Sequence, residues 1–393
     1  MSAILVVNPG SSSRKYALYC DGAAEVVWEA EMTGTTYQLC TQVRGSNLVC
    51  DPLNSETYAA IFTRIAHEVN EYIAAHSTTL AAVAVRVTVP GTALQQHAIV
   101  DAAYIQTLHA QEHAAPLTVP AVIRAIQSAQ HHFADTPVVA VSDSAFHATL
   151  PTAARTYSLP KELFVPHDLY RFGYHGLSVA SIVHRIHAVT GADPERMIVC
   201  HLGDTMSVTA VQNGKSFDTT TGFSMTGGLP MGSRGGDIDT MAMLELMRAT
   251  RMSPTDAELL LTTRCGMAGL SGESDLRTVM ARRAAGDTAA TVAIERLVRE
   301  VQRAIGAMAA TLGGLDMVIF TASAGVRSSE LRTMICSKLT HLGLLLSEER
   351  NVVTISRDGV ISERNSPAKI VVMRTDEMGE MAAVATSLCR STT

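Results

Sequence analysis

The feature that most constrains the fold is a strand–turn–strand unit that occurs twice. Residues 4–20 consist of an apolar run, a turn that contains Gly10 and three serines, and a second apolar run. Residues 197–211 repeat this arrangement around a turn that contains Gly203. Apolar runs separated by a short Gly-containing segment are typical of β-hairpins. Two similar hairpins half a chain apart therefore predict two related domains.

The first turn is more polar than a hairpin needs. Gly10 lets the backbone approach a bound group closely, and the serines at 11–13 add hydroxyl groups beside the backbone N–H groups. A turn of this kind can surround phosphate oxygens. An ordinary Ser-rich hairpin loop has the same composition, so the motif alone leaves both interpretations open. A phosphate-bearing ligand between two such turns would be held from both sides.

The composition indicates a globular protein and argues against several classes. The 393 residues are enough for two or three domains, and 47% hydrophobic against 17% charged residues favours a packed core. A net charge of -6 argues against nucleic acid as a partner. No apolar run approaches the roughly 18 residues of a membrane span, and the N-terminus lacks a signal-peptide pattern. We therefore expect a soluble, cytoplasmic protein without a membrane partner.

The seven cysteines are scattered along the chain and form no C-x-x-C pair. This spacing favours neither a zinc ribbon nor a disulfide framework, and it is typical of a reducing compartment. The string H-A-Q-E-H at residues 109–113 matches the inverted zinc-peptidase pattern H-x-x-E-H. No further ligand accompanies it, so we do not assign a zinc site.

The first half of the chain alternates strands with helices. The predicted strands are 25–32, 36–43, 47–49, 80–89 and 138–141, and the predicted helices are 57–76, 102–112 and 119–132. Such alternation favours an α/β sheet, in which ligands bind beyond the carboxyl ends of the strands. Arg86 and Asp143 both lie at predicted strand ends. Each is either a ligand-binding group or a surface ion or turn cap.

The second half starts near residue 151 and contains a long Gly-rich loop. Residues 218–239 hold six glycines and one cation, Arg234. A loop of that length inside a compact domain is usually functional. His175 lies near a predicted helix start, and a predicted strand at 317–321 ends on a third candidate phosphate turn at 322–325. The other predicted elements are helices 241–250, 254–263, 275–285 and 288–312, a strand at 369–373 and a closing helix.

Seven segments, in chain order and spanning nearly the whole sequence, resemble motifs of the acetate kinase family, also called the acetate and propionate kinases. They are N-P-G-S-S-S-R-K at 8–15, D-S-A-F-H at 143–147, R-F-G-Y-H-G-L-S at 171–178, H-L-G at 201–203, G-L-P-M-G-S-R-G-G-D-I-D at 228–239, S-G-E-S-D-L-R at 271–277 and T-D-E at 375–377. Taken together these segments are highly specific.

The resemblance implies an α/β fold of two related domains of the actin-like ATPase (ribonuclease H-like) type, with the active site in the cleft between them. The expected domains are residues 1–147 with 380–393, and a nucleotide-binding domain of residues 148–379. The implied reaction is reversible phosphoryl transfer between ATP and acetate or propionate, which gives an acyl phosphate and ADP. The implied cofactor is Mg²⁺, with Mn²⁺ as a substitute, and the expected assembly is a homodimer.

The resemblance also implies a role for individual residues. The catalytic residues are Asp143, which orients substrate and magnesium, Arg86 and Arg234, which hold the carboxylate and the transferring phosphoryl group, and His175, which donates to the transition state. Asn8 and Glu377 accompany the metal. The substrate-binding residues are Arg86, Thr88, Leu117, Tyr174 and Met225. The nucleotide-binding residues are Lys15, His201, Gly203, Asp204, Asp275, Leu276, Arg277, Ala324 and Gly325.

The sequence departs from the family pattern around the outer phosphate turns. The family's H-L-G-N-G becomes H-L-G-D-T at residues 201–205, and G-G-I-G-E-N becomes A-S-A-G-V-R at 322–327. Asp204 would repel a nucleotide phosphate unless a cation such as Arg327 intervenes. An ATP-dependent short-acid kinase remains the first interpretation. The alternatives are the same chemistry with a different donor, such as pyrophosphate, and a non-catalytic binding or regulatory relative.

Overall fold

The structure is a computed structural model that describes residues 2–10 and 13–391. The chain divides into two compact units: an N-terminal unit, Met1–Ala145 with Asp376–Thr393, and a C-terminal unit, Phe146–Thr375. The sequence predicted the corresponding boundaries at residues 147 and 379. Ser11 and Ser12 of the predicted phosphate turn lie outside the described residues.

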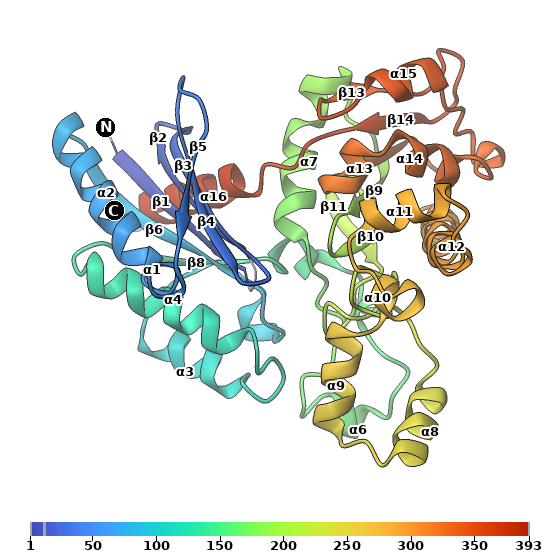
Figure 1. Ribbon diagram of the computed structural model, residues 1–393, viewed down its shortest axis with the longest axis horizontal. Helices are drawn as coiled ribbons and strands as arrows, with labels where there is room; N and C mark the ends of the chain where they lie inside the picture. The colour runs from blue at the N-terminus through green and yellow to red at the C-terminus, as the bar shows by residue number, and fades with distance from the viewer. Residues whose placement is uncertain (1, 11–12, 392–393) are drawn as a thin grey trace. The chain divides into compact units, whose positions relative to one another are not determined.

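The N-terminal unit is built on a mixed sheet (Figure 1). In the described part of the chain the strand order is β5-β4-β3-β2-β1-β6-β8-β7, and β1, β6 and β8 are parallel to one another. The strands are β1 (Ser2–Pro9), β2 (Ser13–Cys20), β3 (Ala23–Thr33), β4 (Thr36–Val43), β5 (Val49–Leu53), β6 (Thr79–Val87), β7 (Ala98–Ile99) and β8 (Val138–Ser142). The helices are α1 (Ser55–Ala59), α2 (Ile61–His76), α3 (Ala102–Ala110), α4 (Val119–His132) and α16 (Glu377–Ser391).

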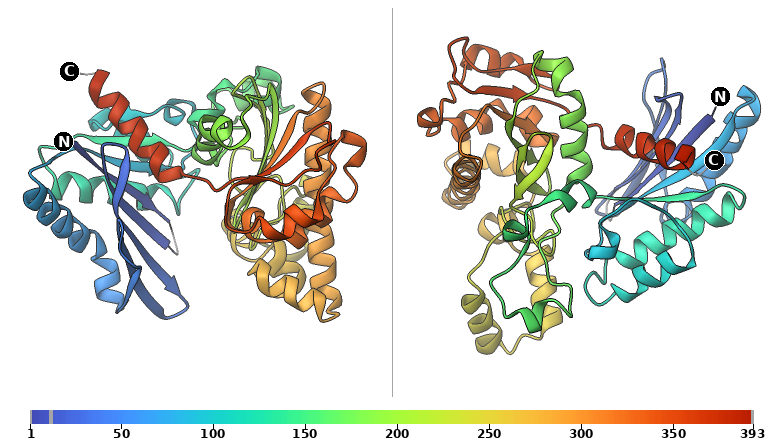
Figure 2. Two further views of the ribbon diagram at one scale, coloured as in Figure 1. Left: turned by 90° about the horizontal axis from the view of Figure 1, so that it is seen from above. Right: turned by 180° about the vertical axis from the view of Figure 1, so that it is seen from behind.

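This sheet is covered on both faces because its central strands are apolar on both sides. Ala3, Leu5 and Val7 of β1 are buried in one core with α2 and α4. The alternating residues Ile4 and Val6 are also buried, and α16 packs against β1 and β6 (Figure 2). Complete burial of one Leu or Ile side chain contributes about 1.5–3 kcal/mol. The two-sided core therefore holds the carboxyl ends of β1, β6 and β8 rigidly.

The C-terminal unit has a second mixed sheet. Over the described residues its order is β11-β10-β9-β12-β14-β13. The strands are β9 (Arg196–Leu202), β10 (Met206–Gln212), β11 (Lys215–Thr219), β12 (Met317–Thr321), β13 (Gly359–Val360) and β14 (Lys369–Val372). The helices are α5 (Thr152–Arg155), α6 (Lys161–Phe164), α7 (Gly176–Thr190), α8 (Thr240–Thr250), α9 (Pro254–Thr263), α10 (Gly266–Ser271), α11 (Leu276–Ala284), α12 (Thr288–Thr311), α13 (Ala322–Arg327), α14 (Ser329–Cys336) and α15 (Glu348–Val353).

Helices also cover both faces of the second sheet. Ile182 and Ile186 of α7 pack with Val199 and Ile319 on one face. On the other face, α12 contributes a long apolar stripe that packs with β9, β10 and β12. Since α7 and the hairpin β9–β10 share this packing, the start of α7 and the end of β9 are fixed relative to each other.

The two sheets share one topology. The order β3-β2-β1-β6-β8-β7 corresponds strand by strand to β11-β10-β9-β12-β14-β13. In both, three antiparallel strands adjoin two parallel ones, and the sixth strand pairs antiparallel to the fifth. The repeated hairpin of the sequence is β1–β2 in one unit and β9–β10 in the other. The predicted fold class, an α/β fold of two related domains, is confirmed.

The predicted helix at 57–76 and the predicted strand at 47–49 are partly wrong. The helix is two helices, because the chain breaks at Ala60 between α1 and α2. Asn54 caps α1 through a capping box with Thr57, which starts that helix earlier than its apolar pattern indicates. Strand β5 lies at Val49–Leu53, later than predicted, and contains Pro52, which an edge strand tolerates.

One disulfide bond is present that the sequence analysis did not predict. Cys40 of β4 and Cys50 of β5 lie directly opposite each other and are bonded. Their separation of ten residues gives no sign of this, because the pairing depends on the register between β4 and the edge strand β5. The remaining five cysteines are free. Separately, none of the helices in residues 2–10 and 13–391 is both long and apolar enough to cross a membrane.

Candidate active site

One arginine and two carboxylates form a cluster in the N-terminal unit, the Arg86 cluster. Arg86 is the next-to-last residue of β6, and Asp143 follows the last residue of the parallel strand β8. Glu377 is the first residue of α16. Arg86 Nη2 donates to Asp143 Oδ1 at 2.9 Å, and Nη1 donates to Glu377 Oε2 at 2.7 Å. The fold therefore brings together three residues that the sequence analysis named separately.

The Arg86 cluster is almost shielded from solvent. The side chains of Arg86, Asp143 and Glu377 are 12%, 0% and 17% exposed. Burial by itself lowers the pKa of Arg86, but the charges and hydrogen bonds of the two acids outweigh it and hold the pKa above its ordinary value. One cation faces two acids, so the cluster has a formal charge of −1 and is suited to bind a further cation.

The other predicted site residues of this unit are held less firmly. Asn8 of β1 pairs with Lys15 of β2, and Lys15 forms an ion pair with Glu29. Thr88 follows β6 directly and is half-buried. Leu117 lies in the loop before α4 and is 70% exposed. The charge of Lys15 is thus already matched locally, and Leu117 faces solvent.

In the C-terminal unit, backbone hydrogen bonds hold the Gly-rich loop that carries Arg234. Met231 N–H donates to Arg234 O at 2.9 Å, and Met267 N–H donates to Met231 O at 2.8 Å. Gly266 starts α10 with φ 62°, and a Cβ atom there would overlap the carbonyl oxygens of Met231 and Arg234. Glycine at this position therefore lets α10 pack against the backbone at Arg234 and fix it.

Arg234 has no acidic partner. Its Nη1 is buried and makes no hydrogen bond within the described residues, and no ion pair of Arg234 is found there. Burial lowers the pKa of Arg234, and only Tyr174 acts in the opposite direction. Because a guanidinium does not lose its proton in proteins, the charge remains in place. A partly buried cation without a partner is unfavourable until an anion binds beside it.

His175 is held on both ring nitrogens. Nδ1 lies 2.9 Å from Ser207 Oγ, and Nε2 lies 2.9 Å from Thr205 Oγ1. The ring stacks on that of His201, with centroids 4.1 Å apart and planes 11° apart. His175 has a left-handed backbone, φ 59°, directly before α7. A left-handed non-glycine residue is uncommon, and strained residues of this kind tend to cluster at active sites and ligand-binding segments.

A second histidine fixes the backbone in front of His175. His147 Nε2 lies 2.9 Å from Tyr174 O, the carbonyl of the peptide that joins Tyr174 to His175. His147 Nδ1 lies 2.8 Å from Ser216 Oγ. A Cβ atom at Gly173 would overlap the His147 ring, so only glycine fits this approach. Because a carbonyl oxygen only accepts, Nε2 of His147 carries the hydrogen.

The two predicted substrate-binding residues of this unit differ in how firmly they are held. Tyr174 is 1% exposed, and its hydroxyl donates to Phe223 O at 2.8 Å. Met225 is half-buried in the Gly-rich loop. The Tyr174 ring therefore has a fixed orientation, whereas Met225 has a flexible side chain on an irregular segment.

The predicted nucleotide-binding residues lie at two helix or strand ends. His201 lies near the end of β9 and Gly203 follows its last residue, while the carbonyl oxygen of the exposed Asp204 accepts from Gly232 N–H at 3.4 Å. Asp275 caps α11, in which Leu276 is half-buried, and pairs with Arg277 at 2.8 Å. The hydrogen bond and charge of Asp275, and to a smaller degree the charge of Asp204, raise the pKa of Arg277. Arg277 is thus one cation whose charge interacts with that of Asp204.

The predicted third phosphate turn at 322–325 is wrong, because these residues belong to helix α13. The helix follows β12 without a loop, and Ala324 and Gly325 lie within it. Arg332 is fully buried and donates to Gly325 O at 2.9 Å and to Val326 O at 3.0 Å, which satisfies the last carbonyls of α13. The sequence contained no proline or acidic first turn to show a helix start at Ala322.

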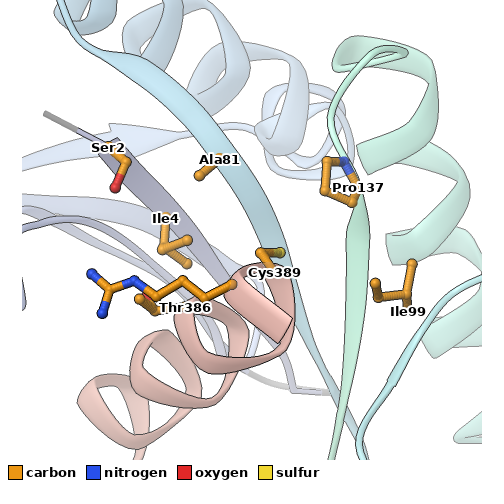
Figure 3. A pocket seen from close by; sticks show the side chains of 8 residues that line it. Ser2, Ile4, Ala81, Ile99, Pro137, Thr386 and Cys389 are labelled. Atoms are coloured by element: carbon orange, nitrogen blue, oxygen red, sulfur yellow. The ribbon is translucent and has the colours of Figure 1, made fainter. Parts of the chain in front are cut away.

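The cavity in Figure 3 is not part of this site. It has a volume of about 390 Å³ and lies in the N-terminal unit between α16 and the sheet. Its lining includes Ser2, the first residue of β1, Ala81 near the start of β6, and Pro137, which precedes β8. Arg86 and Asp143 lie at the opposite ends of the same parallel strands. The cavity therefore opens at the sheet edge away from the Arg86 cluster.

Comparison with known proteins identifies the family. The sequence profile of the Acetokinase family matches residues 3–383. The chain belongs to the Acetokinase family. It is 34% identical to the acetate kinase of Clavibacter michiganensis over 97% of this chain and 98% of that protein. It is 32% identical to the acetate kinase of Flavobacterium johnsoniae over 96% and 97%.

Solved structures of the same family resemble this one. A propionate kinase from Francisella tularensis has a TM-score of 0.89 at 30% identity and covers 97% of this chain and 98% of its own. The Porphyromonas gingivalis acetate kinase has a TM-score of 0.86 at 27% identity, with 99% and 100% covered. Acetokinase family members are phosphotransferases with a carboxylate acceptor, so this chain is a carboxylate kinase by family and the predicted enzyme class is confirmed.

The Acetokinase family uses ATP with a divalent metal, and the Arg86 cluster fits such an ion. Magnesium keeps several waters and takes one or two carboxylates. Asp143 and Glu377 are two such carboxylates beside one guanidinium, and they leave a formal charge of −1. No group of three or more His, Cys, Asp or Glu side chains suited to a metal exists in the described residues.

The sequence reasoning missed the hydroxyl groups that hold His175. Thr205, Ser207 and Thr209 alternate along the chain into β10, and alternate residues of a strand share one side. Ser207 bonds to His175 and Thr209 bonds to Thr219. The T-x-S-x-T pattern was the available signal, since a buried strand has little other reason to carry hydroxyls at every second position.

Proposed function

We propose that this protein catalyses reversible, Mg²⁺-dependent transfer of the terminal phosphoryl group of ATP to acetate or propionate, which gives an acyl phosphate and ADP. The observation that supports this best is Arg234, a partly buried guanidinium without an acid partner on a backbone fixed by α10. A cation in that state is suited to a group that gains negative charge, such as a transferring phosphoryl.

Different residues of the chain would then bind the phosphoryl group and the metal. Arg234 would neutralise the phosphoryl oxygens, and paired N–H groups of a guanidinium match such oxygens in geometry. Arg86 is oriented by Asp143 and Glu377, and these two acids would hold Mg²⁺, which would screen charge on the phosphate chain.

The donor is tested at Asp204. An ionised carboxylate only accepts hydrogen bonds, so it opposes phosphate oxygens, whereas an amide can donate to them. Asp204→Asn should lower the KM for ATP, and the same change at the exposed Asp193 should not. Steady-state assays with ATP and with pyrophosphate, in both variants and wild type, decide the donor. If wild type prefers pyrophosphate and Asp204→Asn leaves ATP use unchanged, the donor is not a nucleotide.

The acid is tested by parallel assays with acetate, propionate and butyrate. Acyl phosphate is trapped as the hydroxamate, and kcat/KM is compared among the three acids. Failure of all three, with either donor, would favour a binding or regulatory role and contradict the proposed function. We also propose a homodimer, as the family resemblance implies, and light scattering on the purified chain tests it independently of activity.

A further inference from the structure

His175 does not reach solvent directly, because two hydroxyl groups and a second imidazole enclose it. Its exposed fraction is 2%, and the rings of His175 and His201 stack at 4.1 Å. Ser207 Oγ lies at Nδ1, and Thr205 Oγ1 lies at Nε2, each at 2.9 Å. Thr205 is the more exposed of the two, since it is half-buried while Ser207 is 0% exposed.

The buried serine decides which ring nitrogen carries the hydrogen. A neutral imidazole has one donor and one acceptor nitrogen, and a hydroxyl can fill either role. Ser207 Oγ has His175 as its hydrogen-bond partner and no other within residues 2–10 and 13–391. A buried hydroxyl hydrogen without an acceptor is costly, so the Ser207 hydroxyl donates to Nδ1. Nε2 of His175 therefore carries the hydrogen and donates it to Thr205 Oγ1.

This arrangement leaves the hydroxyl hydrogen of Thr205 directed away from His175. Thr205 Oγ1 accepts from Nε2, and its own hydrogen has no acceptor among the residues that the structure describes. The backbone of Thr205 is held as well, because Gly203 N–H donates to its carbonyl at 3.2 Å. The Thr205 side chain is thus a fixed, polarised donor, and it is the more exposed member of the hydrogen-bonded pair His175–Thr205. The family motif H-L-G-N-G has glycine here, which offers no hydroxyl.

We propose that the Thr205 hydroxyl is a catalytic residue that donates to an oxygen of the transferring phosphoryl group. In this chain His175 then acts through Thr205 and is a positioning residue, which accounts for its burial. The inference rests on the proposed function for the identity of the ligand. No proton leaves either side chain during the step; both hydrogen bonds shorten as charge develops on the phosphoryl oxygens.

Kinetics of paired variants at residue 205 test the contact. Thr205→Val has nearly the same shape without the hydroxyl and should lower kcat by about 10²- to 10³-fold with little change in KM, the typical loss of one transition-state donor. Thr205→Ser restores the hydroxyl and should recover kcat to within about threefold of wild type. The matched control is Thr190→Val at the far end of α7, whose hydroxyl bonds to the backbone carbonyls of Ile186 and Ala192 and to the N–H of Ala192. Equal losses in the Val and Ser variants, or none, would overturn the proposal.

Histidine side-chain ¹⁵N spectra test the hydrogen-bond arrangement without any turnover. The resonances of His175 are assigned by comparison with His175→Gln. Wild type should show Nε2 protonated and Nδ1 unprotonated, and Ser207→Ala should shift the ring toward the other tautomer. Nδ1 protonated in wild type would overturn the inference while leaving the proposed function intact. If wild type transfers no phosphoryl group to any carboxylic acid, the proposed function fails and the Thr205 contact fails with it.

Discussion

Arg86 and Arg234 differ in the charges that surround them. Arg86 lies between Asp143 and Glu377, and these acids hold its pKa above the ordinary value despite burial. Arg234 forms no ion pair with an acid among the residues that the structure describes, and burial lowers its pKa. The charge of Arg86 is therefore matched by acids within its own cluster, whereas the charge of Arg234 remains available. The difference teaches that the same residue type can be held by acids in one unit and left open to an anion in the other.

The largest expected effect is the loss of activity in Arg234→Ala. An arginine that stabilises a transferring phosphoryl group is worth about 10³- to 10⁵-fold in kcat. The free energy of unfolding should stay the same or rise, because the change removes a desolvated charge without a partner. Steady-state kinetics and urea denaturation measure both quantities on the same preparation.

The control for this variant is Arg264→Ala, an exposed arginine that follows α9 in the same unit. It should leave kcat and stability unchanged. If Arg234→Ala unfolds more easily than wild type, then Arg234 has a structural partner and the contrast with Arg86 is wrong.

Arg86→Ala should lower both activity and stability. Removing one partner of a buried ion pair typically costs about 3–5 kcal/mol, because the remaining charges stay buried without compensation. The side chain of Asp143 is fully buried and that of Glu377 nearly so, which places the Arg86 cluster in this class. Urea denaturation monitored by circular dichroism gives the change directly.

A double variant tests whether uncompensated carboxylates cause the loss of stability in Arg86→Ala. Adding Glu377→Gln to Arg86→Ala removes one of the two stranded carboxylates and should restore part of the lost stability. If the two changes add without any such recovery, the acids do not interact with Arg86 in solution, and the comparison between the arginines loses its electrostatic basis.

We expect activity to depend on a divalent metal, and among the residues tested only those of the Arg86 cluster should change that dependence. EDTA should abolish activity, and Mg²⁺ or Mn²⁺ should restore it. Glu377→Gln should raise the Mg²⁺ concentration needed for half-maximal rate by about tenfold or more, whereas the exposed Glu349→Gln should not. Elemental analysis should find no stoichiometric zinc. One zinc per chain would instead direct attention to His109 and His113.

Sequence periodicity predicted the regular elements well where one period dominated. Helix α4 at Val119–His132, helix α9 at Pro254–Thr263 and strand β12 at Met317–Thr321 have the predicted bounds. Periodicity could not predict features that depend on contacts between segments distant from one another in the sequence. The bond between Cys40 and Cys50 depends on strand register.

The candidate site was predictable as residue types but not as an arrangement. Arg86, Asp143 and Glu377 could be named from strand ends and motif resemblance, yet their mutual hydrogen bonds depend on α16 returning to the first sheet. Within the described residues Arg234 has no acid partner, and this too depends on packing, since the sequence around it contains Asp237 and Asp239. The Thr205 contact was missed because residue 205 was read only as a departure from a motif.

The smallest expected effect concerns the exposed pair Asp275–Arg277, which contrasts with the buried pair Arg86–Asp143. Hydrogen bonding from Arg277 holds the pKa of Asp275 below its ordinary value, with further contributions from the backbone N–H groups of Arg277 and Thr278. A carboxyl group whose pKa is lowered on folding stabilises the fold above its unfolded pKa, near 3.8, and loses this contribution as the pH falls through the folded value.

At neutral pH, Asp275→Ala should lower the free energy of unfolding by about 1 kcal/mol or less, because it removes a helix cap whose charge is screened by solvent. Arg277→Ala should cost only a small part of that, since the backbone hydrogen bonds remain. Urea denaturation at pH 7 and pH 2.5 checks the sign: the charge-dependent part of the difference between Asp275→Ala and wild type should be present at pH 7 and absent at pH 2.5. If Asp275→Ala lowers the free energy of unfolding at pH 7 as much as Arg86→Ala does, then solvent exposure does not explain the expected difference between the two ion pairs.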